Sequence, residues 1–581
     1  MNSKYKKSTP HGWILTPLLF LKLRGWENML KIKTISIFCL AIMLIASLAI
    51  AGPRKASALT SSQERQYLVA GYGSALPNPA AISAAGGVWI DQIPSMGLAI
   101  VKSNNPNFLT LVKQDWSVEL AATDIDVKNP EAEPTAEEEA ALDEAEAQMA
   151  QMEDQAAASG VLPNDMFFFA QWPHLAMGIP EAHNRGITGS GVTVAVVDYG
   201  INCGPLQHPD LAPSITNISF VPLGPLNCSQ NSDCTKLTNS DGSLRASCDT
   251  IQHLCVLPDG SSTGFEDPCE DKRILLPNQF AHGTPIAGII AALCDNGIGV
   301  CGIAPDAKIA NYKVGPSNGG SFPTSRLVKA YDLASDPSNP HRADIINASH
   351  IVFCENTPSD PSDCRDMHKI LQRMSITVFK RGTLLIAAAG NDGKNVSLED
   401  TLIWPAAHAP HVTIVGAVAP CGGALDGILG NDFIDNLTNY SNYGFESNYL
   451  VMPSGNSTDG CSYPRTNCRV NSSTLPTGFL NIPCQLWDQI PTTTRKDFKA
   501  PGANFPPFTT GYTFFSGTSG STPHASGLAA LWLSNERSQG RDPKINQVAE
   551  ALLSDLLLVD IGLPGYDELF GFGRGTAAFI Q

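Results

Sequence analysis

Residues 517–533 read GTSGSTPHASGLAALWL. Ser519 stands in a glycine-rich turn, and the small and apolar residues after it predict a helix with Pro523 in its first turn. A serine in such a turn can present its hydroxyl as a nucleophile, and the unpaired N–H groups at the start of a helix stabilise negative charge beside it. Turns of this composition are common, so the interpretation depends on the segments upstream.

Two polar residues upstream stand at the borders of predicted apolar elements. Residues 192–197 form an apolar, β-branched run that is typical of a buried parallel strand, and Asp198 follows it directly. Open α/β sheets place their sites at this carboxyl edge. His282 begins a segment, 282–293, that predicts a helix.

A further apolar strand, predicted for residues 384–389, is followed by a glycine and Asn391. The polar residues Asp198, His282 and Ser519 therefore follow one another in the order Asp, His, Ser. This is one of the chain orders found in the catalytic triads of serine hydrolases.

These segments resemble the motifs of the subtilases, the subtilisin-like serine proteases, and the resemblance extends from about Gln171 to the end of the chain. Four more segments are similar to other blocks of the family, and they are residues 299–307, 343–349, 499–502 and 571–574. The resemblance implies an α/β fold with three α/β/α layers around a mostly parallel sheet.

The resemblance also implies a role for each polar residue. Ser519 is the expected nucleophile, His282 the general base, and Asp198 the group that orients the imidazole. Asn391 is expected to donate to the tetrahedral oxyanion. The expected substrate-binding residues are Ser349, Ala389 and Gly390. The alternatives are a capping aspartate, a core histidine and two turn residues, which the number of ordered matching segments disfavours.

Four residues depart from the family pattern, and one of them is Tyr199, which replaces the small residue that usually follows the aspartate. Gly520 stands where methionine is usual, which predicts a looser turn after Ser519. His350 and Ile351 stand where a bulky residue and then glycine are usual, so the pocket for the residue before the scissile bond is expected to differ in shape.

Length and charge restrict the class of protein. The chain has 581 residues, of which 43% are hydrophobic, so it can bury a large core and form more than one domain. The formal net charge of −17 disfavours nucleic acid as a partner, because phosphate binding requires clustered Lys and Arg. Protein or peptide substrates remain the expected partners.

Residues 1–58 are interpreted as an export signal region. Lys31 and Lys33 precede an apolar run at 35–51, and Met29 as the start gives a signal of ordinary length. An uncleaved anchor is the alternative, although the run is at the short limit for a membrane span. The expected location is secreted or extracytoplasmic, with membrane contact only through this signal.

The fifteen cysteines favour an oxidising compartment. Without Cys39 in the signal, fourteen remain, an even number that predicts a disulfide framework in an exported chain. Five of them predict a disulfide-linked surface insertion at about 203–277. A zinc site is the alternative, but the spacing lacks the Cys-x-x-Cys pairs that would support it.

The remaining boundaries follow from composition. Residues 59–127 show a β-α-β pattern and resemble the inhibitory propeptide of subtilases, which would act as the chain's own inhibitor. Residues 128–160 are acidic and predict either a solvated helix or a disordered linker. The catalytic domain is expected at 161–581. Activating cleavage is expected at 155–164, with 123–128 as the alternative.

The sequence thus predicts a secreted serine endopeptidase, made as a zymogen, that works through an acyl-enzyme intermediate. Its chemistry requires no cofactor, and the family resemblance allows structural calcium without assigning ligands. One alternative is a catalytically silent subtilase used for binding, which predicts a lost triad residue. The other is an α/β-hydrolase esterase, which requires a Gly-x-Ser-x-Gly motif and a different chain order.

Overall fold

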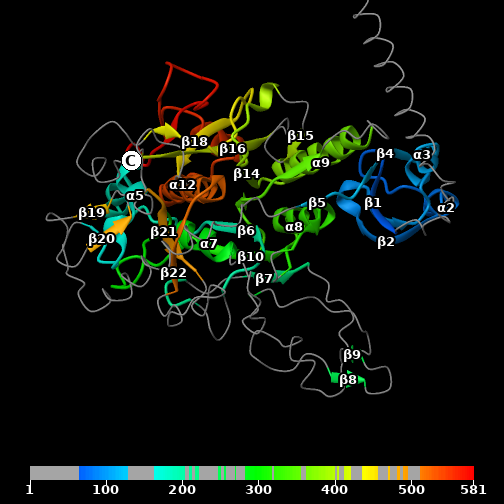
Figure 1. Ribbon diagram of the computed structural model, residues 1–581, viewed down its shortest axis with the longest axis horizontal. Coiled ribbons are helices and arrows are strands. Elements are labelled where there is room, and N and C mark those ends of the chain that lie inside the picture. The colour runs from blue at the N-terminus through cyan, green and yellow to red at the C-terminus, as the bar shows by residue number, and fades with distance from the viewer. Residues whose placement is uncertain are drawn as a thin grey trace, which may run out of the picture. The chain divides into compact units, whose positions relative to one another are not determined.

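A computed structural model describes the fold between residues 64 and 581, with gaps (Figure 1). The residues it describes are 64–127, 162–202, 208–211, 216–220, 247–249, 254–256, 269, 282–316, 320–354, 362–398, 402–404, 411–420, 435–455, 469–471, 480–483, 488–494 and 511–581. The expected export signal and acidic segment lie outside these ranges, as does most of the expected cysteine-rich insertion.

A mostly parallel sheet forms the centre of the fold (Figure 1). Within the described ranges it has ten strands, namely β23 (Leu558–Val559), β24 (Arg574–Gly575), β18 (Tyr449–Pro453), β16 (Val412–Ala419), β14 (Leu384–Ala388), β12 (Ile345–Ala348), β6 (Thr193–Asp198), β10 (Lys308–Lys313) and β7 (Thr216–Ser219) in this spatial order, with β17 (Asn436–Leu437) beside β16. All neighbours from β7 to β24 are parallel, whereas β23 and β17 are antiparallel to their partners.

Helices bury both faces of this sheet. The helices on one face are α7 (Gly283–Ala291) and α12 (Thr518–Ser538), and those on the other are α8 (Thr324–Ser335) and α9 (Asp363–Lys380). Along β6, Val194 and Val196 pack in the core of α7 and α12, whereas Ala195 and Val197 pack in the core of α8 and α9. Successive side chains of a strand point to opposite faces, so a strand covered on both sides is apolar throughout. The predicted three-layer α/β fold is confirmed.

Residues 64–127 form a small sheet of their own. Its antiparallel strands lie in the order β2 (Gly87–Ile93), β3 (Leu98–Ser103), β1 (Arg65–Gly71) and β4 (Val118–Thr123), with helices α2 (Pro79–Ala84) and α3 (Phe108–Val112). The β-α-β pattern predicted for this segment is confirmed. Tyr67 and Val69 pack on Phe108 in a separate core, whereas Leu68 and Ala70 on the other face join the core of α8 and α9.

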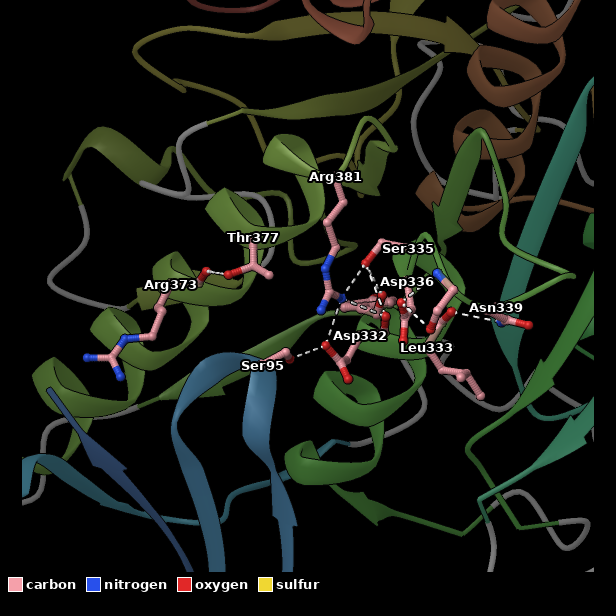
Figure 2. A network of polar contacts seen from close by, with 11 residues as sticks. Ser95, Asp332, Leu333, Ser335, Asp336, Asn339, Arg373, Thr377 and Arg381 are labelled. Atoms are coloured by element: carbon pink, nitrogen blue, oxygen red, sulfur yellow. Dashed lines mark hydrogen bonds and ion pairs between the residues drawn. The ribbon is translucent and has the colours of Figure 1, made fainter. Parts of the chain in front are cut away.

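Polar contacts also join the small sheet to α8 and α9. Arg373 of α9 forms an ion pair with Glu119 at 2.7 Å and donates to three backbone carbonyl groups of the small unit. Figure 2 shows Asp332 of α8 between Ser95 and Arg381. The Ser95 hydroxyl donates to Asp332 Oδ1, and Arg381 Nη1 donates to the same oxygen at 2.8 Å.

The remaining elements connect or flank these layers. They are η1 (Pro94–Met96), β5 (Asp126–Val127), η2 (Phe168–Ala170), α5 (Trp172–Ala176), α6 (Ile179–Asn184), β8 (Ser247–Asp249), β9 (Leu254–Val256), β11 (Phe322–Pro323), β13 (Val352–Cys354), η5 (Val396–Leu398), β15 (Leu402–Trp404), β19 (Arg469–Asn471), β20 (Leu480–Pro483), β21 (Ile490–Thr493), β22 (Tyr512–Phe515) and α13 (Ile545–Leu552). Two-stranded sheets pair β5 with β11, β8 with β9, β13 with β15, β19 with β20 and β21 with β22.

Candidate active site

A buried aspartate–histidine pair lies at the carboxyl edge of the central sheet. Asp198 is the last residue of β6, and His282 directly precedes α7. His282 Nδ1 donates to the Asp198 carboxylate, at 3.0 Å from Oδ1 and 2.9 Å from Oδ2. The backbone N–H of Tyr199 donates to Asp198 Oδ1 at 2.8 Å. These contacts fix the imidazole ring with Nε2 directed away from the carboxylate.

The start of α12 holds Ser519 in place. Gly517 precedes the helix with φ of 93°, a conformation that favours glycine. Asn391 caps the helix from outside, because its Oδ1 accepts from Thr518 N at 2.8 Å and from Thr518 Oγ1 at 2.7 Å. With both donors on Oδ1, the Asn391 amide presents Nδ2 as its remaining donor.

Ser349 and Ser519 exchange two hydrogen bonds. Ser519 Oγ donates to the Ser349 carbonyl oxygen at 3.3 Å, and Ser349 Oγ donates to the Ser519 carbonyl oxygen at 3.1 Å. The second bond takes the place of a helical hydrogen bond. In a regular helix the N–H of residue 523 would donate to the Ser519 carbonyl oxygen, but Pro523 has no N–H. The prediction of Pro523 in the first helical turn is wrong, since it lies inside α12, and Ser349 is the residue that makes this position tolerable.

The other residues expected to bind substrate also meet at the start of α12. Gly390, with φ of 102°, donates its N–H to Thr518 Oγ1 at 3.1 Å. The Ala389 carbonyl oxygen accepts from Asn442 Nδ2 at 3.1 Å. The structure therefore brings the predicted residues from the ends of β12 and β14 to the N-terminus of the helix that carries Ser519.

A buried tyrosine–histidine pair lies next to the aspartate–histidine pair. His350 Nε2 is hydrogen-bonded to the Tyr331 hydroxyl, and the two rings are stacked. Burial lowers the pKa of His350 to about 4, with Asp198 opposing the shift and the nearby His282 adding to it. His350 is therefore neutral near pH 7. Sequence reasoning did not assign it a role, because a single histidine after a strand carries no specific signal.

Ser454 supports the turn at Gly520. Its hydroxyl donates to the Gly517 carbonyl oxygen at 2.6 Å. A Cβ atom added to Gly520 would lie 2.8 Å from Ser454 Oγ. The absence of a side chain at Gly520 thus makes room for Ser454, which holds the turn from outside and is not predictable from the local sequence.

A model of the subtilase family matches residues 189–573, more than half of the chain. The chain belongs to the subtilase family. The matched range contains every residue of the candidate site described above.

This subtilase is similar to curated relatives over part of their length. It is 26% identical over 408 residues to the extracellular basic protease of Dichelobacter nodosus, which covers 69% of this chain and 53% of that protein. It is 30% identical over 251 residues to subtilisin Savinase of Lederbergia lenta, which covers 42% of this chain and 62% of that protein. The chain thus spans about half to three fifths of the length of these relatives.

Solved structures support the same fold. The epidermin leader peptide processing serine protease of Staphylococcus aureus superposes with a TM-score of 0.54 at 16% identity, over 89% of this chain and 98% of that chain. At this level of identity the likeness establishes the fold alone.

In the described part of this subtilase, one group of side chains brings potential metal-ligand atoms close to one another. It consists of His183, Cys294 and Cys301. Cys294 and Cys301 form a disulfide, so their sulfur atoms are not thiolate ligands. Cys269 and Cys364 are also disulfide-bonded. For these four cysteines the predicted pairing is confirmed.

Within the described ranges, no helix combines the length and the hydropathy that crossing a bilayer requires. The apolar run at 35–51 lies outside those ranges.

His524 should make this subtilase sensitive to acid. It is fully buried in α12, its Nδ1 donates to the Gly520 carbonyl oxygen at 2.8 Å, and burial lowers its pKa to about 4. In the unfolded chain this histidine binds a proton below about pH 6.5, whereas in the folded protein it stays neutral down to about pH 4. The free energy of unfolding therefore falls as the pH is lowered from about 6.5 towards 4. His524→Asn keeps a donor near the Nδ1 position without titrating.

Between about pH 7.5 and pH 5, the free energy of unfolding of the wild type should fall by about 2 kcal/mol relative to His524→Asn. Denaturant titrations of both proteins at the two pH values measure the difference. The same pH dependence in both proteins would contradict a depressed pKa for His524.

Proposed function

We propose that this subtilase is a serine endopeptidase that uses Ser519, His282 and Asp198. The observation that carries the proposal is the buried hydrogen-bonded pair of Asp198 and His282, because a histidine held in this way by a carboxylate is the general base of a serine hydrolase. His282 also lies close to the segment that leads into α12. The centroid of its ring is 5.7 Å from that of Phe515, which ends β22 four residues before Ser519.

We infer the following reaction for these residues. Ser519 Oγ attacks the scissile carbonyl carbon, and its proton moves to His282 Nε2 while Asp198 stabilises the imidazolium that forms. For this step the hydroxyl hydrogen turns away from the Ser349 carbonyl oxygen. The protonated His282 then protonates the leaving amine, and water, activated by the same imidazole, hydrolyses the acyl-enzyme.

The oxyanion of the tetrahedral intermediate needs donors that are already in place. Ser519 N–H at the start of α12 and Asn391 Nδ2 are suitable, because the Asn391 side chain is held by two bonds to its Oδ1. Neither donor has to reorganise when negative charge develops on the oxygen.

Asn391→Ala is expected to lower kcat by about two to three orders of magnitude with little change in KM. Asn391→Asp is the matched comparison, because it keeps an oxygen acceptor for Thr518 while it replaces the Nδ2 donor with an oxygen and adds a negative charge beside the expected oxyanion. Steady-state kinetics on a peptide amide measure both. Near-wild-type kcat in Asn391→Asp would show that Asn391 acts only as a helix cap.

Hydrolysis of a denatured protein by the purified, processed chain tests the proposed activity. The expected result is cleavage at internal peptide bonds that is abolished by prior treatment with a serine-directed fluorophosphonate. Complete absence of hydrolysis by a folded, processed preparation would favour a catalytically silent binding protein.

We further propose that residues 64–127 act as an intramolecular inhibitor in a zymogen. Their sheet packs on α8 and α9, and β5 continues from it to pair with β11 in the register Val127 to Phe322. The Phe322 ring is 5.5 Å from that of Tyr199, which is 6.4 Å from the His282 ring. The chain therefore leaves the small unit close to the proposed triad.

The expected cleavage window at 155–164 lies largely outside the described residues. The alternative window at 123–128 includes Asp124, which is buried and accepts from Ser325 N at 3.0 Å. N-terminal sequencing of the active enzyme distinguishes the two positions. A mature enzyme that begins before Tyr67 would contradict both.

An extracytoplasmic location completes the proposal. It is supported by the predicted signal at 35–51 and by relatives named as extracellular. Fractionation of cells that express the full chain, compared with a variant lacking residues 1–58, tests it. Equal retention of both forms inside the cell would contradict export.

A further inference from the structure

The ends of two neighbouring strands flank the proposed nucleophile. β12 and β14 are parallel neighbours with Ala348 opposite Ala387. Beyond them, Ser349 contacts Ser519 Oγ through its carbonyl oxygen, and Gly390 contacts Thr518 Oγ1 through its N–H. A substrate residue whose carbonyl carbon lies against Ser519 Oγ therefore has its side chain close to these two segments.

Ile351 and Asn442 fill the space beside Gly390. A Cβ atom added to Gly390 would lie 3.0 Å from Ile351 Cδ1 and 2.5 Å from Asn442 Nδ2. The Asn442 amide is fixed, since Nδ2 donates to the Ala389 carbonyl oxygen at 3.1 Å and to Asp392 Oδ2 at 3.2 Å. Gly390 therefore faces two side chains, and one of them is Ile351, which stands where glycine is usual in the family.

The Ile351 side chain cannot easily move away. It is 3% exposed and belongs to an apolar cluster with Ala389, Phe445 and Tyr449. Packed interiors contain little free volume, and forcing additional atoms into them shifts side chains and backbone at a cost. A large substrate side chain entering beside Gly390 would have to displace this cluster.

We propose that Ile351 restricts the residue that supplies the scissile carbonyl to small side chains, namely glycine, alanine and serine. The inference rests on the proposed peptidase function and specifies its substrate class. Ile351 acts by occupying volume, so its removal changes the preference among substrates and leaves the chemistry of Ser519 unchanged.

A series of peptide amides that differ only in this residue tests the inference. The wild type should favour alanine over phenylalanine by about a hundredfold in kcat/KM. Ile351→Val removes only Cδ1, the atom of Ile351 that lies nearest to a Cβ at Gly390, and should raise the leucine-to-alanine ratio by about tenfold. Ile351→Ala opens more space and should raise the phenylalanine-to-alanine ratio by at least as much.

Ile414→Val is the matched control. Ile414 belongs to the same buried cluster and loses the same methyl group, but it is not among the atoms nearest to Gly390. It should leave both ratios within about twofold of the wild type. Ile351→Val is a mild change for a core, so the comparison holds even if Ile351→Ala folds poorly.

The outcomes separate this inference from the function on which it rests. Hydrolysis by the wild type with phenylalanine or leucine preferred, or unchanged ratios in Ile351→Val, would overturn the inference alone. A processed wild type that hydrolyses no member of the series, alanine included, would overturn the proposed function and the inference together.

Discussion

Ser519→Ala is expected to lower kcat for peptide hydrolysis by about six orders of magnitude, because it removes the atom that forms the acyl-enzyme. The precursor should also accumulate unprocessed if the chain cleaves itself. The substitution removes one hydroxyl whose bond to the Ser349 carbonyl oxygen is 3.3 Å long, so folding should be retained. Steady-state kinetics and gel analysis of the purified chain measure both effects.

Ser521→Ala is the control for this prediction. Ser521 is a fully buried serine two residues further along α12, and its hydroxyl donates to the Thr518 carbonyl oxygen at 3.0 Å. Its substitution should leave kcat within a few-fold of the wild type. Near-wild-type hydrolysis by a clean Ser519→Ala preparation would remove Ser519 from the mechanism.

Asp198→Asn is expected to lower kcat by about four orders of magnitude while preserving the shape of the site. Asn can donate to His282 Nδ1 through its amide, which favours the tautomer with the proton on Nε2, so His282 can no longer accept the Ser519 proton. The same substitution also removes the charge that stabilises the imidazolium. Kinetics at neutral pH and a circular dichroism spectrum separate the loss of activity from a loss of folding.

Asp344→Asn serves as the comparison for Asp198→Asn. Asp344 directly precedes β12 at the opposite edge of the sheet, and it forms an ion pair with Arg537 at 2.7 Å. Its substitution should change kcat by no more than a few-fold. Similar losses in both variants would assign Asp198 a structural role.

The fold was predictable where local pattern decides it. The apolar run before Asp198 predicts a buried strand, and it forms β6, because a strand covered by helices on both faces needs apolar side chains at every position. The segment after His282 predicts a helix, and it forms α7. Residues 64–127 likewise follow their predicted β-α-β pattern, which alternates short apolar runs with small-residue helices.

The candidate site was predictable only in part, because its supporting contacts join distant segments. Ser349 was expected to bind substrate, yet its hydroxyl also completes α12 at the position where Pro523 lacks an N–H. Ser454 directly follows β18 and holds the turn at Gly517 from more than sixty residues away in the sequence, with no local signature. The departure at Ile351 was visible in the sequence, but its contact beside Gly390 was not.

Labelling the processed enzyme with a fluorophosphonate and mapping the modified residue tests the central claim most directly. Such a probe forms a covalent bond with a serine only where a base and an oxyanion site activate the hydroxyl. We expect one adduct per molecule, on Ser519, and its loss in His282→Ala. An adduct on another serine, or hydrolysis that persists without any adduct, would contradict it.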